Sequence, residues 1–195
     1  MAARHRAAVP ALCLLAGLAL LGCNPTSGHP RTSATPTPTV VSTPTLTPTP
    51  TPAVTDCQAT AMTAFLGQSD SAAGHIVYAI VLIDTGTASC ALDGYPTVTL
   101  VGISGDLPTT QTNGNDGIPS VSTTPAVVTI AAGGTASFVL QYRDVATGAQ
   151  TCPTATQLQI VLPGGGGALV ADLTGVNPCG GVVYVSPVRS GIAPP

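Results

Sequence analysis

The stretch HIVYAIVLID, from His75 to Asp84, decides the fold. It is rich in β-branched residues and apolar on both faces, as expected of a central strand that is buried on both sides. Asp84, Thr85 and Gly86 end it, because Asp and Gly favour turns. No segment elsewhere shows a sustained 3.6-residue apolar period with capping residues, so the sequence predicts an all-β fold.

Seven further runs rich in Val, Ile, Thr or Leu lie between turn signals and are predicted as strands. Val127–Ile130 and Thr135–Tyr142, separated by the Gly133 and Gly134 turn, are predicted to form a hairpin. Seven to eight short antiparallel strands at this spacing favour an immunoglobulin-like β-sandwich. The other predicted strands are Thr60–Leu66, Thr97–Ile103, Gln157–Leu162, Ala168–Leu173 and Gly181–Ser186.

The N-terminus has the pattern of a bacterial lipoprotein signal. Two arginines precede the apolar run Val9–Leu21, which has the length of a signal-peptide core and is too short for a transmembrane helix. We expect residues 1–22 to be removed and Cys23 to be lipidated, with Cys13 lost in the signal. An ordinary secretory signal cleaved nearby is the alternative. The expected location is extracytoplasmic, on a membrane.

Residues 23–55 consist largely of Thr and Pro. Such a segment cannot bury enough apolar surface to offset its ordering entropy, so we expect a disordered tether. Alternating Pro favours extended polyproline II at about 3.1 Å per residue, which makes the tether a semi-rigid spacer. Dense Thr beside Pro also resembles O-glycosylated stalks, and an unmodified spacer is an equal alternative.

Residues 56–188 are long enough for one domain with a hydrophobic core, and 189–195 are predicted to be a C-terminal tail. The whole chain lacks Lys and Glu. From residue 56 onward it carries two arginines, Arg143 and Arg189, against eight aspartates, a net charge near −6. No basic patch for a phosphate backbone is present, so a nucleic-acid partner is not expected.

Four cysteines remain once Cys13 and Cys23 are set aside: Cys57, Cys90, Cys152 and Cys179. An even number in an exported domain indicates two disulfides, and spacing alone leaves three possible pairings. We favour Cys57–Cys90 and Cys152–Cys179. Each would close a loop of about 30 residues and stabilise the domain by roughly 3–4 kcal/mol.

Candidate chemistry in the domain is sparse. His75 begins an apolar strand, and the sequence lacks the G-x-S-x-G motif that would accompany a nucleophilic serine. The run Asn113–Gly117 resembles the start of a calcium loop but lacks the leading Asp and closing Glu, so a flexible loop is expected. Arg143 and Asp144 are candidates for an exposed ion pair. No catalytic residue, cofactor or metal site is predicted.

The domain resembles a bacterial family catalogued as domain of unknown function 4232. The resemblance spans Cys57 to Pro187, and its most specific piece is the C-x-L-x-G-x-P run from Cys90 to Pro96. It implies a β-sandwich with paired cysteines and carries over no catalytic residue. Other matching stretches are AAGHIVYAIVLIDTG, AAGGTASFVLQYRDV, Cys152 with Pro153, and Cys179 with the following glycines and VVYVSPV.

Three functions are open at this point. The favoured one is a non-catalytic module on the cell envelope that binds a protein, a cell-wall polymer or a small ligand through the loops Ser104–Thr124 and Gly164–Gly167. Its membrane partner would be reached through acyl chains on Cys23. The second is an envelope hydrolase that uses Asp residues or His75, and the third is a structural role without a ligand.

Overall fold

The computed structural model describes residues 54–118 and 121–192. The chain divides into two units, Met1–Pro48 and Thr49–Pro195, and all described residues belong to the second. The expected signal peptide, the lipidated Cys23 and nearly all of the tether lie outside the described residues. Within them the fold is all-β and sandwich-like, as predicted, with strands in three sheets and two short 3₁₀ turns.

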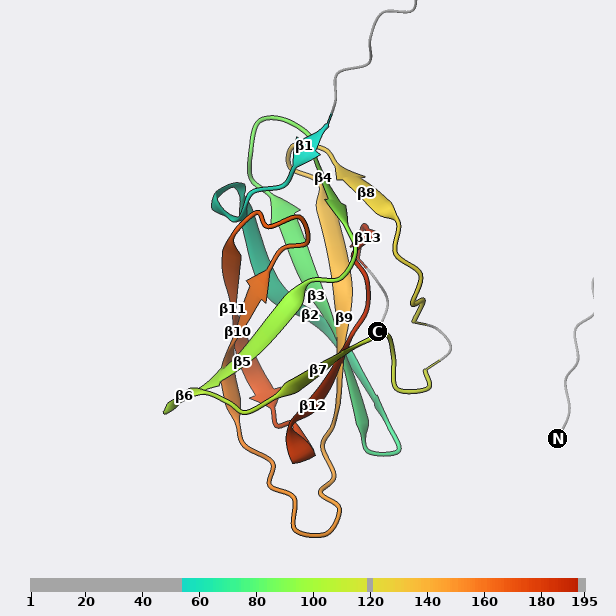
Figure 1. Ribbon diagram of the computed structural model, residues 1–195, viewed down its shortest axis with the longest axis vertical. Helices are drawn as coiled ribbons and strands as arrows, with labels where there is room; N and C mark the ends of the chain where they lie inside the picture. The colour runs from blue at the N-terminus through green and yellow to red at the C-terminus, as the bar shows by residue number, and fades with distance from the viewer. Residues whose placement is uncertain (1–53, 119–120, 193–195) are drawn as a thin grey trace, which may run out of the picture. The chain divides into compact units, whose positions relative to one another are not determined.

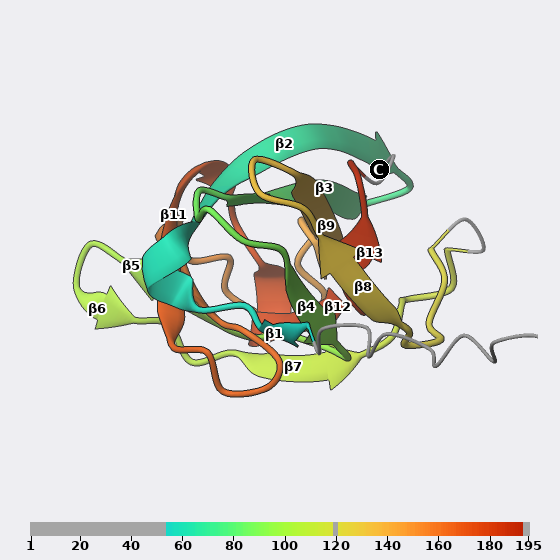
Figure 2. The same cartoon turned by 90° about the horizontal axis from the view of Figure 1, so that it is seen from above.

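A six-stranded sheet forms one side of the domain, in the order β2-β3-β9-β12-β7, with β13 paired to the end of β9. In the view of Figure 2 this sheet curls, so that β2 and β7, its end strands, lie at opposite sides of the domain. Its strands are β2 (Met62–Ala72), β3 (His75–Asp84), β7 (Thr110–Asn113), β9 (Thr135–Arg143), β12 (Val182–Val185) and β13 (Arg189–Ser190).

Two smaller sheets complete the domain (Figure 1). The four-stranded sheet has the order β11-β10-β5-β6, with β5 (Thr97–Gly102), β6 (Gly105–Asp106), β10 (Ala155–Val161) and β11 (Ala168–Val176). The three-stranded sheet has the order β1-β4-β8, with β1 (Thr55–Asp56), β4 (Cys90–Asp93) and β8 (Val127–Ile130). The 3₁₀ turns are η1 (Ala59–Ala61) and η2 (Cys179–Gly181).

Large apolar side chains from all three sheets pack into one core. Their removal from water stabilises the fold. Fully burying one such side chain stabilises the fold by roughly 1.5–3 kcal/mol. The largest buried side chains include Ile80, Leu82, Phe138 and Leu140 from the six-stranded sheet, Leu100, Leu158 and Ile160 from the four-stranded sheet, and Leu92 and Ile130 from the three-stranded sheet.

Strand β3 runs from His75 to Asp84, as predicted. Its residues are apolar on both sides because both faces of its sheet are covered. Ile80 and Leu82 point into the main core, whereas Val77 packs in a second cluster with Val139 and Val121 on the outer face.

The predicted hairpin between Val127–Ile130 and Thr135–Tyr142 is wrong in its pairing. Strand β8 pairs with β4, and β9 pairs with β3 and β12. The linking turn instead bonds the end of β3: the Gly133 amide donates to the Asp84 carbonyl at 2.9 Å, and the Asp84 amide to the Gly134 carbonyl at 3.0 Å. The glycine turn therefore carries the chain from one sheet to another.

Other strand predictions need smaller corrections. The first predicted strand begins at Met62 rather than Thr60 and continues to Ala72 through a register shift between Leu66 and Ser69. The predicted loop Ser104–Thr124 contains β6 and β7. Not every pairing is antiparallel, because β1 runs parallel to β4 and β7 parallel to β12. The ordered strands also extend past the expected domain limit, since Arg189 and Ser190 of the predicted tail pair with β9.

Candidate functional site

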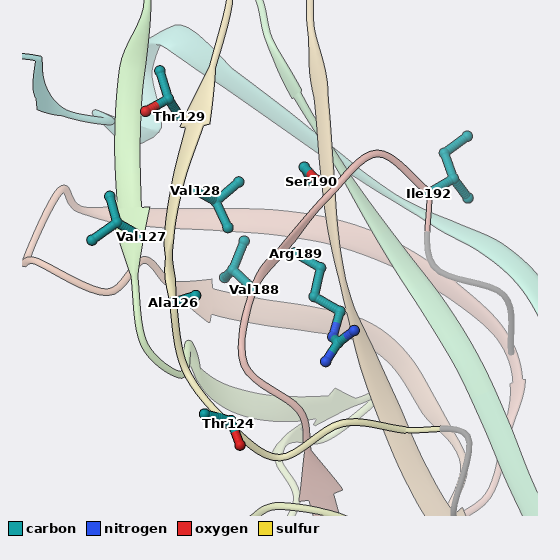
Figure 3. Close-up of a pocket in the computed structure, with 9 residues that line it drawn as sticks. All are labelled: Thr124, Ala126, Val127, Val128, Thr129, Val188, Arg189, Ser190 and Ile192. Atoms are coloured by element: carbon teal, nitrogen blue, oxygen red, sulfur yellow. The ribbon is translucent and has the colours of Figure 1, made fainter.

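A groove of about 560 Å³ separates β8 from the C-terminal segment that contains β13 (Figure 3). One wall is the strand β8 together with the residues leading into it, and the other wall is the run from Val188 to Ile192. The volume lies within the range of roughly 300–1,000 Å³ that is typical of ligand pockets. The lining residues are Thr124, Ala126, Val127, Val128, Thr129, Val188, Arg189, Ser190 and Ile192.

The backbone of β8 is unpaired on the edge away from β4, which follows from one hydrogen bond on β4. The Cys57 amide donates to the Ala91 carbonyl at 3.0 Å, so the peptide groups of Ala91 face β1. In an antiparallel ladder, two directly opposite residues either exchange both backbone hydrogen bonds or both direct their N–H and C=O groups away from each other. Ala91 lies opposite Thr129, so Thr129, and Val127 two residues earlier, direct their N–H and C=O groups away from β4. Within the described residues this edge of β8 is therefore free.

No other strand among the described residues pairs with this edge of β8. The strand, VVTI, contains no charged residue or proline, and Pro125 precedes it by two residues. Its length of four residues is one of the features by which proteins protect an exposed strand. The peptide groups of two exposed residues, Val127 and Thr129, are therefore left without a partner strand.

The side chains around this edge are mainly apolar, with one cation. Val127 is 67% exposed and Ile192 59% exposed, which is high for side chains of this size. Arg189 lines the groove and forms no ion pair with a carboxylate of the described chain. Asp93 is the cross-strand neighbour of Val127 but belongs to β4, on the opposite side of β8.

A second polar cluster joins the 114–118 segment to the open end of the β3–β9 pair. The Asp116 carboxylate lies 2.9 Å from Nε of Arg143 and 3.2 Å from Nδ1 of His75 through the same oxygen, Oδ2. The Asp116 amide donates to Oε1 of the buried Gln141 at 2.9 Å. Nε2 of Gln141 has no hydrogen-bond partner among the described residues.

This cluster corrects two expectations. The Asn113–Gly117 run does not resemble a free loop, since Asp116 and Asn115 both bond to neighbouring segments, Asn115 through its side-chain amide to the Val121 carbonyl at 2.8 Å. Arg143 pairs with Asp116 rather than with Asp144, and this contact raises the pKa of Arg143. The segment is therefore a polar cover over the outer face of the six-stranded sheet.

The glycine loop Gly164–Gly167, the other expected contact surface, packs against the start of the domain. The Ala59 amide donates to the Gly166 carbonyl at 2.6 Å. A Cβ at Gly166 would collide with the Cys57 carbonyl oxygen, so only glycine allows this close approach. The loop therefore secures the N-terminal strand.

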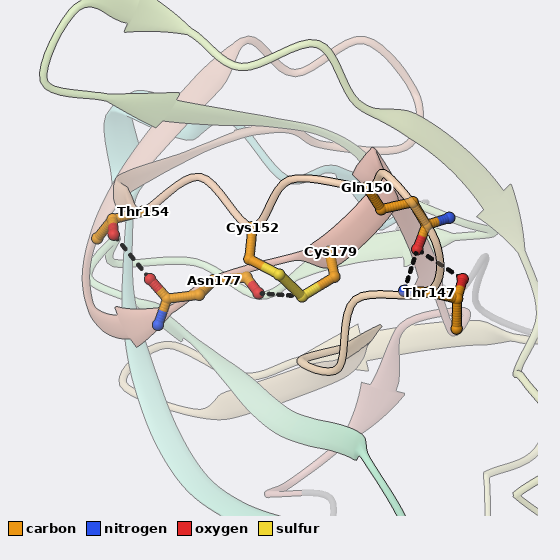
Figure 4. Close-up of a disulfide and its surroundings, with 6 residues drawn as sticks. All are labelled: Thr147, Gln150, Cys152, Thr154, Asn177 and Cys179. Atoms are coloured by element: carbon orange, nitrogen blue, oxygen red, sulfur yellow. Dashed lines mark hydrogen bonds between the residues drawn. A yellow bond between two sulfur atoms is a disulfide. The ribbon is translucent and has the colours of Figure 1, made fainter.

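Both favoured disulfides, Cys57–Cys90 and Cys152–Cys179, are present in the structure. The first joins the residue after β1 to β4, and so holds the first described strand on the three-stranded sheet. The second joins the chain before β10 to η2 (Figure 4). Beside it the Thr154 hydroxyl donates to Oδ1 of Asn177 at 2.8 Å, and Oε1 of Gln150 accepts from the Thr147 hydroxyl at 2.9 Å.

Across the described segments, His, Cys, Asp and Glu side chains nowhere gather in a set of three that would suit a metal ion. The same segments contain no helix of the length and apolarity that a membrane crossing requires.

The groove residues Val127, Thr129 and Arg189 are not predicted from the sequence, which puts Arg189 in a C-terminal tail and pairs Val127–Ile130 with Thr135–Tyr142. One signal was available: Pro125 stands just before an uncharged, β-branched run, and strands that follow a proline are often at the edge of a sheet.

Comparison with known proteins gives one match. A family model described as "Domain of unknown function (DUF4232)" matches residues 57–189. The search of curated proteins finds no match, and neither does the search of solved structures. The matched range includes both disulfides and most of the groove, up to Arg189.

Proposed function

The chain belongs to the family described as domain of unknown function (DUF4232), and from that premise we propose that it is a non-catalytic binding module displayed outside the cytoplasm. Its binding surface is the groove between β8 and β13. The module is held at the membrane by acyl chains on Cys23 and kept at a distance by the Thr/Pro tether.

The anchor is supported by the sequence. Two arginines, an apolar run and Gly22 precede Cys23 in the order that lipoprotein processing requires. One acyl chain binds a bilayer only marginally, whereas two or more anchor a protein stably, each CH₂ adding about 0.8 kcal/mol. Residues 24–55, if extended as polyproline II, reach on the order of 100 Å from the bilayer. Two disulfides suit an oxidising compartment.

The free edge of β8 is the observation that carries the binding role. An unpaired strand edge presents a row of backbone N–H and C=O groups with which another chain can pair, and proteins usually protect such an edge. Here Val127 and Thr129 leave their peptide groups without a partner strand, at an edge beside a groove that is lined by exposed apolar residues. Such a combination of backbone ladder and side-chain pocket is the arrangement by which β-strand addition gives affinity and specificity.

The hydrolase alternative has less support. It needs two carboxylates near His75 in a cleft. Among the described residues one carboxylate, that of Asp116, forms an ion pair with His75, and it also pairs with Arg143. His75 and Asp116 also lie at the open end of the β3–β9 pair, and neither lines the groove.

A cross-linking experiment in intact cells tests the binding role. A photo-reactive residue replaces Val127 in the groove or, as a matched control, Val170, which is 53% exposed on β11. We expect a discrete adduct from position 127 and none from position 170. Equal labelling at both positions, or none at either, contradicts the proposal.

The anchor is tested separately by Cys23→Ala. We expect a fatty-acid label to enter the unmodified protein and not the variant. Labelling of both forms, or of neither, would contradict lipidation at this residue.

A further inference from the structure

We propose that Cys57–Cys90 is a redox-active disulfide, and that the buried carboxylate of Asp84 beside it favours its reduction by a dithiol. This inference is independent of the groove and goes beyond the binding role. It is drawn from the surroundings of one carboxylate oxygen, from the pocket beside Cys90 and from the place of this disulfide in the sheet.

The side chain of Asp84 is a buried acid without a counter-charge. It is 1% exposed, and no arginine or histidine of the described chain forms an ion pair with it. Its Oδ1 accepts a hydrogen bond from the Gly86 amide at 2.8 Å. Its Oδ2 lies 3.6 Å from Sγ of Cys90 and has no other hydrogen-bonding contact among the described residues. Leaving a buried carboxylate oxygen without a donor costs free energy.

The oxidation state of Cys90 decides whether this oxygen has a donor. In the disulfide, Sγ of Cys90 carries no proton, so the contact places a carboxylate oxygen beside a sulfur that cannot donate. In the dithiol, the S–H of Cys90 can donate to Oδ2 of Asp84 across the same contact. A hydrogen bond to an ionised acceptor is about twice as strong as one between neutral groups. Asp84 therefore stabilises the reduced form relative to the disulfide.

The pocket beside this contact gives a reductant access to one of the two sulfurs. Cys90 and Asp84 both line a pocket of about 270 Å³ at the start of β4. Cys57 is fully buried and does not line it. An incoming thiolate is therefore expected to attack Cys90, the residue that contacts the carboxylate.

The exchange needs an external dithiol, which supplies two electrons and two protons. Its first thiolate attacks Sγ of Cys90, the S–S bond breaks, and Sγ of Cys57 leaves with the electron pair and takes up a proton. Its second thiolate then attacks the reductant's own sulfur in the mixed disulfide and displaces Sγ of Cys90. That sulfur takes up the second proton and forms the hydrogen bond to Oδ2 of Asp84. The products are two protein thiols and the oxidised dithiol.

Reduction would loosen the first strand of the domain. Cys57 directly follows β1, which pairs with β4 over two residues (Figure 1). The same segment is held by the bonds from the Cys57 amide to the Ala91 carbonyl at 3.0 Å and from the Ala59 amide to the Gly166 carbonyl at 2.6 Å. The Thr/Pro segment leads directly into β1 in the sequence. The disulfide is therefore a redox-sensitive joint where the chain enters the domain.

The first test compares the two disulfides of one molecule. The purified protein is equilibrated in buffers of reduced and oxidised dithiothreitol, its thiols are alkylated, and peptide mapping gives the reduced fraction of each pair. We expect Asp84→Asn, which keeps the acceptor for the Gly86 amide, to lower the equilibrium constant for reduction of Cys57–Cys90 about tenfold. This corresponds to about 30 mV. Cys152–Cys179 in the same molecule should be unaffected.

A matched variant controls for charge. Asp93→Asn makes the same charge change at the exposed end of β4 and should shift neither disulfide. An unchanged Cys57–Cys90 in Asp84→Asn, or an equal shift of both pairs, would overturn the proposal, since an equal shift reports a change in global stability. A shift of Cys57–Cys90 in the opposite direction would also overturn it, because the carboxyl group would then be protonated and support the disulfide.

The second test examines the joint itself. The double variant Cys57→Ser, Cys90→Ser stands in for the reduced pair without a redox buffer. We expect amide exchange at position 57 and at Ala59 to speed up at least tenfold, while the amides of β3 and β9 stay protected. Loss of protection throughout the domain would show that this disulfide is a structural cross-link and would contradict its role as a joint. Unchanged exchange at both positions would contradict it as well.

Discussion

The two faces of the six-stranded sheet are both covered, but by different kinds of contact. On the inner face β9 contributes Phe138, Leu140 and Tyr142 to the main core, where they pack against apolar side chains of the other two sheets. On the outer face the alternate residues Ser137 and Gln141 are almost fully buried as well, yet both are polar. Between them Val139 packs with Val77 and Val121 in a small apolar cluster, so β9 separates a large apolar core from a cover that is partly polar.

The outer cover depends on directional bonds in addition to its small apolar cluster. The Ser137 hydroxyl donates to the Gly191 carbonyl at 2.8 Å, and Gln141 accepts the Asp116 amide. Apolar packing is proportional to the area buried and resists local opening, whereas a cover held by a few polar contacts opens at lower cost. The difference indicates that the inner face sets global stability and that the outer cover sets local motion at the 114–121 segment.

The largest expected effect comes from Phe138→Ala on the inner face. Phe138 is fully buried, so its truncation loses transfer free energy and leaves a cavity, which lowers the free energy of unfolding by about 3–5 kcal/mol. Phe65→Ala is the matched control, because Phe65 is 43% exposed on β2 and should cost below about 1 kcal/mol. Urea unfolding measures both. Similar losses from the two variants would contradict a core centred on the inner face.

The second largest expected effect is a loss of stability at alkaline pH, caused by Tyr142 at the end of the inner face. Burial, then the nearby Tyr78, raises the pKa of Tyr142 from 10 to about 12. Since the unfolded chain ionises first, this stabilisation is complete below pH 10 and is lost as the pH rises through 12. We expect a loss of about 2 kcal/mol across that window.

Tyr142→Phe should flatten this part of the pH profile, while Tyr184→Phe should retain it. Unfolding midpoints in guanidinium between pH 9 and 12 provide the measurement. A profile that is unchanged in Tyr142→Phe would show that another group causes the alkaline loss. At neutral pH the Phe variant also loses the hydrogen bond from the Tyr142 hydroxyl to the Gly175 carbonyl, worth about 1 kcal/mol.

Features with a strong periodic signal could be predicted from the sequence, and β3 is the clearest example. Its bounds and its double-sided burial follow from HIVYAIVLID alone. Both disulfide pairings also agree with the favoured ones. The bounds of β8 were correct, but its partner was not, because strand propensity is local whereas pairing depends on where the glycine turn directs the chain.

The missed elements have little apolar pattern. Strand β7 reads TQTN and is positioned by side-chain bonds, with Gln111 accepting the Val98 amide at 2.8 Å and donating to the Pro96 carbonyl at 2.9 Å. These bonds join residues that are 13 and 15 positions apart, and contacts of this kind leave no periodic pattern in the sequence. The groove was missed for the same reason: β8 and β13 are separated by almost 60 residues and come together only through their sheets.

The smallest expected effect is confined to the outer cover. Asp116→Asn removes the charge that pairs with Arg143 and lies beside His75, so the segment around it should open more often. We expect amide exchange at Gly117 and Val121 to speed up several-fold with little change in global stability, and added salt to produce part of the same effect in the unmodified protein. Asp144→Asn, one residue beyond Arg143, makes the same charge change without an ion pair and should leave both amides unaffected. Equal acceleration of amide exchange in the two variants would mean that net charge, rather than the Asp116 contacts, controls opening of the outer cover. The proposed difference between the two faces of the sheet would then not depend on these polar contacts.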